Sequence, residues 1–311
     1  MNSLEHTSST NEISEIDVPS LGWRTAENQE RLYRQRLAVI GAGGAGGGVA
    51  ESAAREGISL TIADPDNFDT TNLNRQTGAY ADTLGQNKAF AIAALAKKIR
   101  SEPYDLRVFE KGLTHENIDE VLADATLVLD AIDISRPDLS VELAREARKR
   151  GLPLFFGIEI GLGCMLTCFA PGAEERDTLE HYFGLGIDEN IGLDTSVPAS
   201  KLITHMPSYT PRGLLEAFQS GQLPSTPGIH PGVLTHTGAM MTVIERWIFE
   251  DKTSYPQFVY PYMYAIDPID GLMVVHADDR EEHLSASLKL IGKNRISSGF
   301  SLPEDYTVAK L

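Results

Sequence analysis

Four glycines directly after a short apolar run are the residues of this sequence most indicative of ligand chemistry. The run at 37–40 (LAVI) is apolar and partly β-branched, as a buried parallel strand requires. Glycine lets the backbone turn tightly and approach a phosphate, while the start of a following helix offers free N–H groups to an anion. The pattern therefore predicts a nucleotide-binding turn formed by Gly41, Gly43, Gly44 and Gly46.

A single acid completes this pattern. A helical run at 48–56 follows the glycines, and a second strand candidate at 60–63 ends on Asp64. Strand, glycine turn, helix, strand and terminal acid form the fingerprint of a nucleotide-binding βαβ unit, in which the acid hydrogen-bonds the ribose hydroxyls. By itself this fingerprint favours a dinucleotide, so an NAD-dependent oxidoreductase is the first alternative function.

Four polar motifs follow the fingerprint and change the interpretation. They are D-P-D at 64–66, N-L-N-R-Q at 72–76, G-Q-N-K at 85–88 and D-A-I-D at 130–133. Together with the glycine turn, and in this order, they resemble the ThiF/MoeB/HesA family of E1-like adenylyltransferases, which activate ubiquitin-like and sulfur-carrier proteins. The resemblance extends over residues 29–171.

The resemblance implies an ATP-dependent activation of a carboxylate as an acyl-adenylate. Both reactants are anionic, so such a site must supply positive charge, a metal and strict alignment. Arg75 and Lys88 are the cations placed to meet the phosphates, and Asp133, after the strand candidate at 125–130, is the expected Mg²⁺ ligand. Each of these residues also has a purely structural alternative. Arg75 would form a surface ion pair, Lys88 would be a solvated helix residue, and Asp133 would cap the helix that follows it.

The resemblance also assigns the remaining cofactor-binding residues. Asp64 would bind the ribose, while Asn72 and Gln76 would help to order the phosphates. Asp66 is counted with the cofactor-binding residues, although the roles of Asp66 and Asp130 are less defined than the others. The implied cofactors are ATP and Mg²⁺, and the implied partner is a small ubiquitin-like or sulfur-carrier protein or peptide.

The chain also departs from the family pattern. Relatives often carry a cysteine in a long crossover loop, but residues 173–232 contain none, and the two cysteines, Cys164 and Cys168, precede it on a strand candidate that favours burial. The paired C-x-x-C motifs of several relatives are missing. Arg24 is the nearest arginine to the expected N-terminal one but is misplaced, and Ile134 replaces an asparagine. We therefore expect adenylation without a loop cysteine; a catalytically degenerate nucleotide-binding scaffold is the second alternative.

The elements that position these residues predict an α/β fold. Further strand candidates lie at 106–109, 125–130, 154–158 and 164–169, and helix candidates at 25–34, 87–99, 116–122 and 139–150. This alternation predicts a doubly wound, mostly parallel, Rossmann-like sheet with the site at the carboxyl ends of its strands. After the crossover loop we expect a C-terminal helix at 238–249, strands at 258–266 and 272–276, and a helical patch at 283–291.

Composition limits the remaining possibilities. We expect a mobile N-terminal arm (1–18), an E1-like adenylation domain (19–276) with its nucleotide-binding core at 36–171, and a charged C-terminal tail (277–311). The net charge of −17 disfavours nucleic acid and anionic lipid as partners. With no long apolar run and no basic leader, we expect a cytoplasmic protein without membrane contact.

Two further expectations concern partners. The family resemblance implies a homodimer. His205, His230 and His236 match no usual zinc spacing, so we expect these histidines to have a structural or partner-contacting role.

Overall fold

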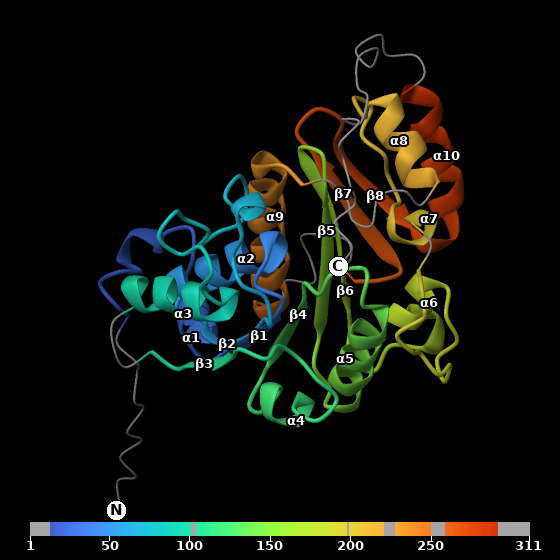
Figure 1. Ribbon diagram of the computed structural model, residues 1–311. Coiled ribbons are helices and arrows are strands. Elements are labelled where there is room, and N and C mark those ends of the chain that lie inside the picture. Colours follow the sequence, from blue (N-terminus) through green and yellow to red (C-terminus); the bar gives the residue numbers. More distant parts are fainter. Residues whose placement is uncertain (1–12, 101–103, 198, 221–227, 250–258, 292–311) are drawn as a thin grey trace, which may run out of the picture.

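An eight-stranded mixed sheet forms the centre of the molecule (Figure 1). The computed structural model describes residues 13–100, 104–197, 199–220, 228–249 and 259–291. The strands follow the spatial order β3-β2-β1-β4-β5-β6-β7-β8. Their bounds are β1 Arg36–Ile40, β2 Ser59–Ala63, β3 Leu106–Phe109, β4 Leu127–Asp130, β5 Leu154–Ile160, β6 Gly163–Phe169, β7 Tyr262–Asp267 and β8 Gly271–His276.

The first five strands are parallel and confirm the predicted doubly wound core. β1 pairs with β2 on one side and with β4 on the other, so the chain reverses its direction of winding at β1. Ile40, the last residue of β1, is in register with Ala63 of β2 and with Asp130 of β4. The carboxyl ends of these three strands therefore meet at one edge, where ligands of open α/β sheets bind.

The other three strands are antiparallel. β5 and β6 form a long hairpin, β7 pairs with β6, and β8 forms the outer edge of the sheet. Cys164 and Cys168 both lie on β6 and are buried, as their alternation predicts.

Helices cover both faces of the sheet, which explains why every residue of β1 is buried. α1, α2, α3 and α9 lie on one face, while α4, α5, α6, α7 and α10 lie on the other, with α8 beside α7 (Figure 1). Their bounds are α1 Ala26–Tyr33, α2 Gly44–Arg55, α3 Lys88–Ile99, α4 Ile118–Val121, α5 Pro137–Lys149, α6 Leu179–Phe183, α7 Ala199–Leu202, α8 Arg212–Gln219, α9 His230–Ile248 and α10 Arg280–Ile291.

Several elements differ from the sequence prediction. α2 begins at Gly44 and α9 at His230, four and eight residues earlier than expected. In the stretch 173–232 we expected a loop with one weakly helical patch at 212–220; α8 confirms that patch, while α6, α7 and the start of α9 are additional helices.

Parts of the predicted N-terminal arm and C-terminal tail are packed against the rest of the chain. Residues 1–12 lie outside the described part, but Asp17 is buried and accepts two hydrogen bonds from Arg100. In the predicted tail, Ser287 of α10 accepts a hydrogen bond from the amide of Met206, and Ile291 is part of the core.

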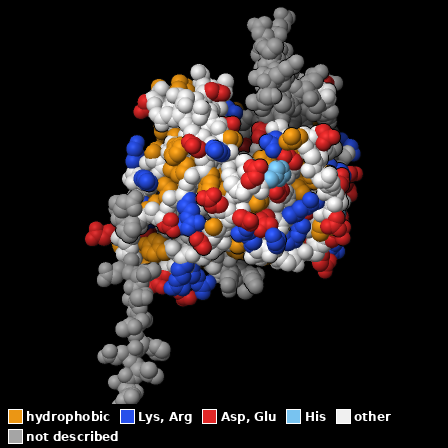
Figure 2. Space-filling view, turned by 60° about the horizontal axis from the view of Figure 1, so that its bottom comes forward, with side chains coloured by type: hydrophobic (Ala, Val, Ile, Leu, Met, Phe, Trp, Pro, Cys, Tyr) orange, Lys and Arg blue, Asp and Glu red, His pale blue; other side chains and the backbone are white. Residues whose placement is uncertain are grey.

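The surface mixes charges of both signs. Figure 2 shows the side of the molecule on which α4 lies, with Lys and Arg side chains interspersed among Asp and Glu. No helix in the described part of the chain is long and apolar enough to cross a membrane.

Candidate functional site

The turn after β1 requires glycine at two positions. Gly41 has a φ of +97°, and a Cβ placed there would lie 2.2 Å from the carbonyl oxygen of Ala131. A Cβ on Gly46 would lie 1.8 Å from the carbonyl oxygen of Gly41. The first turn of α2 therefore packs directly on the loop before it, and Gly43 is the N-cap residue. The first N–H groups of a helix have no partner within the helix, so the start of α2 is a candidate anion-binding position at the edge of the sheet.

Asp64 supports this turn from the end of β2. Its Oδ2 accepts a hydrogen bond from the amide of Ala42 at 2.5 Å, and its Oδ1 accepts one from the amide of Asp66 at 2.8 Å. The side chain is nearly fully buried, and burial raises its pKa despite these two bonds. Asp64 is thus in the predicted place, where its contacts hold the glycine turn against β2.

Lys88 lies beside the same strand end. It is the first residue of α3, it is buried, and its Nζ is 3.0 Å from the Oδ2 of Asp66. Asn87 caps α3 and donates a hydrogen bond to the carbonyl of Asp64. The structure therefore brings Asp64, Asp66 and Lys88 together, and the alternative of a freely solvated Lys88 is wrong.

The N-L-N-R-Q motif lies partly over the glycine turn. A Cβ on Gly43 would lie 3.7 Å from the side-chain nitrogen Nε2 of Gln76, and Gln76 Oε1 is buried with no partner among the described residues. Arg75 points elsewhere: its Nη1 donates to the Thr71 carbonyl and to Asn74, and its Nε lies near Gly228. The exposed-ion-pair alternative does not apply to Arg75 among the described residues, because its hydrogen bonds go to neutral groups.

Asn72 has a local role in this structure. Its Oδ1 accepts a hydrogen bond from the amide of Asp69, and the Asp69 carboxylate in turn accepts one from the amide of Thr71. This capping box holds the short 3₁₀-helix Thr70–Asn72 that carries Arg75 and Gln76 into place.

Two acids follow β4, and their surroundings differ. Asp130 is buried; its Oδ1 accepts a hydrogen bond from the amide of Ile132, and its Oδ2 has no partner among the described residues. Burial raises the pKa of Asp130 to about 6. Asp133 is exposed, and its Oδ1 accepts a hydrogen bond from the amide of Ser135. It does not cap α5, whose N-cap residue is Arg136, so the capping alternative for Asp133 is wrong.

The donor set at β4 fits magnesium. Mg²⁺ is usually bound through one or two carboxylates together with substrate phosphates and water. The unpartnered Oδ2 of Asp130 and the exposed carboxylate of Asp133 offer such oxygens at and just after the end of β4, where Asp130 is in register with Ile40 of β1. Among the residues that the structure describes, no group of three or more His, Cys, Asp and Glu side chains forms a complete metal site.

The structure places two further polar residues at this edge: Glu159, which the sequence analysis did not single out, and His236, for which it expected a structural or partner-contacting role. Glu159, near the end of β5, points at α2: its Oε1 is 3.3 Å from a Cβ on Gly44 and has no partner among the described residues. His236 of α9 is fully buried with neither ring nitrogen bonded in the described structure. Burial lowers its pKa, opposed by the negative charge of Glu159. No local pattern marks either residue, because 77 positions of chain separate them.

The structure also places the other histidines and the cysteines that the sequence analysis singled out. His205 is buried and pairs with Asp270, while His230 begins α9. Burial raises the pKa of Cys164 to about 12 and raises that of Cys168 further, so both thiols are protonated at neutral pH. Arg24 forms ion pairs with Glu56 and Glu245 of its own chain.

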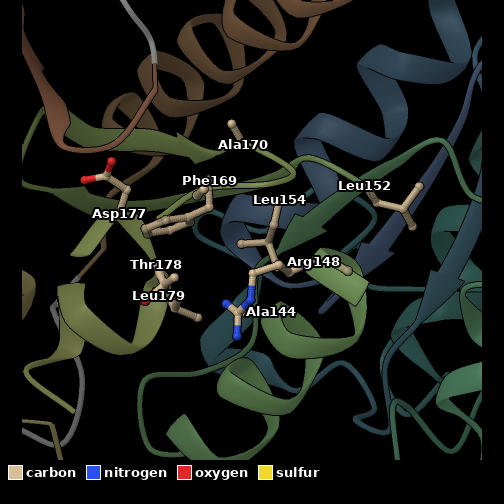
Figure 3. A pocket seen from close by; sticks show the side chains of 11 residues that line it. Ala144, Arg148, Leu152, Leu154, Phe169, Ala170, Asp177, Thr178 and Leu179 are labelled. Carbon is tan, nitrogen blue, oxygen red and sulfur yellow. The ribbon is translucent and has the colours of Figure 1, made fainter. Parts of the chain in front are cut away.

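A small cavity near the start of β5 is a poor candidate for the site (Figure 3). It lies between Leu154, Phe169 and Leu179, and its volume of about 10 Å³ is the space of one water molecule. The unpartnered polar atoms described above lie around the glycine turn instead, which makes the carboxyl edge of the sheet the candidate functional site.

The glycine turn lies within the part of the chain that matches a family of known proteins. The model of the ThiF family matches residues 19–185. The sulfur carrier protein ThiS adenylyltransferase of Bacillus subtilis is 34% identical over 47% of this chain and 43% of that protein. The tRNA threonylcarbamoyladenosine dehydratase of the same organism is 34% identical over 41% of this chain and 50% of its own length. The chain thus spans about half the length of these curated relatives.

Solved structures show the same fold at low identity. PaaA superimposes with a TM-score of 0.61 and 15% identity, covering 89% of this chain and 77% of its own. Escherichia coli MccB in a structure with ATP gives a TM-score of 0.57 and 16% identity, covering 80% of this chain and 65% of its own.

Proposed function

Because the chain belongs to the ThiF family, we propose that it is an E1-like adenylyltransferase that uses ATP to activate a carboxylate. The proposed substrate is the C-terminus of a small ubiquitin-like or sulfur-carrier protein or peptide. One observation carries the proposal: Asp64, Asp66, Lys88, Gln76 and Asp130 gather around a turn in which Gly41 and Gly46 admit no Cβ.

In this proposal the chain's own groups bind and align the nucleotide. The open end of α2 and the glycine amides receive phosphate oxygens, and Asp64 accepts hydrogen bonds from the ribose through lone pairs not used by Ala42 and Asp66. Lys88 exchanges its contact with Asp66 for a phosphate, and Gln76 uses its free Oε1 and its amide to orient the bound nucleotide.

Asp133 and Asp130 would hold Mg²⁺, which when bound supplies positive charge to the leaving pyrophosphate. The substrate carboxylate then attacks the α-phosphorus, the bond to the β-phosphate oxygen breaks, and pyrophosphate leaves. Arg75 is proposed to turn from Thr71 and Asn74 toward the phosphates, because its present bonds are to neutral acceptors only.

Transfer of the activated carboxylate to a cysteine of this chain does not fit the structure. Both cysteines are buried on β6 with raised pKa values, and a protonated, enclosed thiol is a poor nucleophile. The acceptor thiol or amine is therefore proposed to come from another molecule.

Calorimetric titration with ATP–Mg²⁺ and with NAD tests the nucleotide first. We expect ATP to bind and NAD not to bind; a preference for NAD would favour the oxidoreductase alternative. ATP–pyrophosphate exchange with a panel of carrier proteins and peptides then tests the reaction. Binding of ATP without exchange under any partner would favour a scaffold.

The same exchange assay tests the residues. We expect Asp133→Ala and Lys88→Ala each to lower the exchange rate by roughly 10²–10³-fold, as loss of one charge-stabilising group does elsewhere. Lys98→Ala, an exposed residue near the end of the same helix α3, is the matched control and should leave the rate unchanged. An unchanged exchange rate in Asp133→Ala would indicate that Asp130, and not Asp133, is the Mg²⁺ ligand.

We also infer a homodimer. The segment before α1 exposes four apolar side chains, Ile16, Val18, Leu21 and Trp23, and Trp23 is 98% exposed. Exposed apolar clusters of this kind are typical of association surfaces. Light scattering on the purified chain should give twice the mass of 34.0 kDa, and Trp23→Ser should shift the equilibrium toward the monomer.

A further inference from the structure

We propose a second ligand site, for a small oxyanion, at the junction of α6, α7 and α10. These three helices lie side by side, away from the glycine turn (Figure 1). A cavity of about 510 Å³ opens between them, within the size range of small-molecule sites. Lys201 and Arg280 contribute its positive lining groups, and His181 also lines it.

Arg280 differs from the other buried arginines of the described structure in its lack of a carboxylate partner. Arg36, Arg100 and Arg280 are each at most 7% exposed. Arg36 pairs with Asp105, and Arg100 makes two hydrogen bonds to Asp17. Among the described residues, no carboxylate lies within ion-pair distance of Arg280.

Backbone groups hold Arg280 in place without neutralising it. Its Nη1 donates to the carbonyls of Tyr182 and Lys201 at 3.0 and 2.8 Å, and its guanidinium lies over the Tyr182 ring at 5.4 Å. Its Nε is buried with no acceptor in the described structure. A buried charge with unused donors is costly unless something pairs with it, so the site is complete only with an anion.

A buried acid close to Arg280, Glu180, does have charged partners. Glu180, on the same helix as Tyr182, is fully buried and bonds to both Arg145 and Arg148. Arg280 lies at the start of α10 in the same layer, but the two acids at its cavity, Asp278 and Glu281, extend into solvent with side chains 84% and 85% exposed.

Lys201 supplies a second positive charge at the cavity. Its Nζ is 3.5 Å from Glu281, a long and exposed contact that a ligand can replace. Its aliphatic part passes over Gly184, where a Cβ would be 3.5 Å from Cε. A fixed guanidinium and a nearby ammonium are the groups that bind carboxylate or phosphate oxygens, so the ligand class is a small carboxylate or phosphate.

Calorimetric titration of the full chain with inorganic phosphate and with malonate, in phosphate-free buffer, tests this site. We expect saturable binding of at least one anion, weakened at least about tenfold in Arg280→Gln, since a charge-assisted contact is worth about that factor. Tighter phosphate or tighter malonate binding identifies which oxyanion the site prefers. If neither anion binds saturably, the proposal is wrong.

Three further variants locate the binding. Lys201→Ala should weaken anion binding severalfold. This variant tests the site if Arg280→Gln does not fold. Lys289→Ala, an exposed residue of α10 outside the cavity, should leave anion binding unchanged. Lys88→Ala is the third variant: loss of anion binding there, with normal binding in Arg280→Gln, would place the anion at the glycine turn and overturn the proposal.

Discussion

Buried polar groups have different partners in two regions of the molecule. One region is the sheet edge at the glycine turn, and the other is the junction of the crossover loop (173–232) with α10. At the glycine turn, Gln76, Asp130, Glu159 and His236 all keep buried polar atoms without partners in the described structure. At the junction, His283 contacts His205, His205 bonds to Asp270, and Asp270 accepts from Ser208 in a continuous network. Arg280 is the exception there.

This difference separates binding chemistry from packing. Each unpartnered buried polar group costs about 1–3 kcal/mol, so a cluster of them is retained where a ligand completes the hydrogen bonds. A connected network instead fixes neighbouring segments in one arrangement. The unpartnered atoms at the glycine turn therefore indicate ligand binding, whereas the connected hydrogen bonds at the junction indicate a packing role.

The largest effect is expected from adding one methyl group to the glycine turn. In Gly46→Ala the new Cβ would overlap the carbonyl oxygen of Gly41, and the backbone must move. We expect a loss of about 3 kcal/mol or more in the free energy of unfolding, together with loss of ATP binding. Urea denaturation measures the first and calorimetry the second.

Gly238→Ala is the matched control for this change. Gly238 lies within α9, and a Cβ there would meet nothing within 4 Å. Alanine should therefore stabilise the protein by up to about 1 kcal/mol. Equal effects of the two substitutions would contradict the close packing described for the turn.

The next effect concerns Asp130, the buried acid at the end of β4. Because the pKa of Asp130 is raised to about 6, its protonated form stabilises the folded state, and this contribution is lost as the pH rises from about 4 through 6. At about 1.4 kcal/mol per pKa unit, Asp130→Asn should stabilise the ligand-free protein by up to about 3 kcal/mol at pH 7.5, but by only about 1 kcal/mol at pH 4.5. Denaturation curves at both pH values provide the test.

Asp133→Asn serves as the comparison for Asp130, since Asp133 is exposed. Its stability should follow that of the unsubstituted protein at both pH values. A similar gain in both variants would mean that net charge, and not burial of Asp130, sets the pH dependence.

The smallest effect is expected in the histidine network. Burial first, and the nearby His205 second, lower the pKa of His283. A lowered histidine pKa favours the folded state above the unfolded value near 6.5, and the contribution is lost as the pH falls below it. His283→Gln should therefore flatten the decline of thermal stability between pH 7.5 and 5.5. An unchanged slope would show that other groups, such as His236, cause the decline.

The sequence predicted the parallel core because local patterns specify it. Apolar runs mark β1, β2 and β4, and Asp64 and Lys88 were placed at the site by motifs that lie close together in the chain. The start of α2 was missed because glycines disfavour a helix locally, whereas the contact of Gly46 with Gly41 demands them. Pro231 and Gly232 hid the first turn of α9 in the same way, although proline fits the first positions of a helix.

The rest of the site depends on contacts between distant positions. Glu159 is surrounded by apolar strand residues, and nothing nearby in the sequence indicates that it faces Gly44. Arg280 lies in a charged stretch that looks solvated, and only the packing of α10 against Tyr182 and Lys201 shows its charge to be buried. Such residues are found from three-dimensional neighbours and not from spacing.

The burial of both cysteines on β6 has a practical consequence for labelling. Maleimides react with accessible thiolates, and neither Cys164 nor Cys168 offers one at neutral pH. A cysteine introduced at an exposed position such as Leu193 or Ile269 would then be modified selectively in the native background. A fluorophore attached in this way could report on binding to the crossover segment or the β7–β8 hairpin while both natural thiols stay in place.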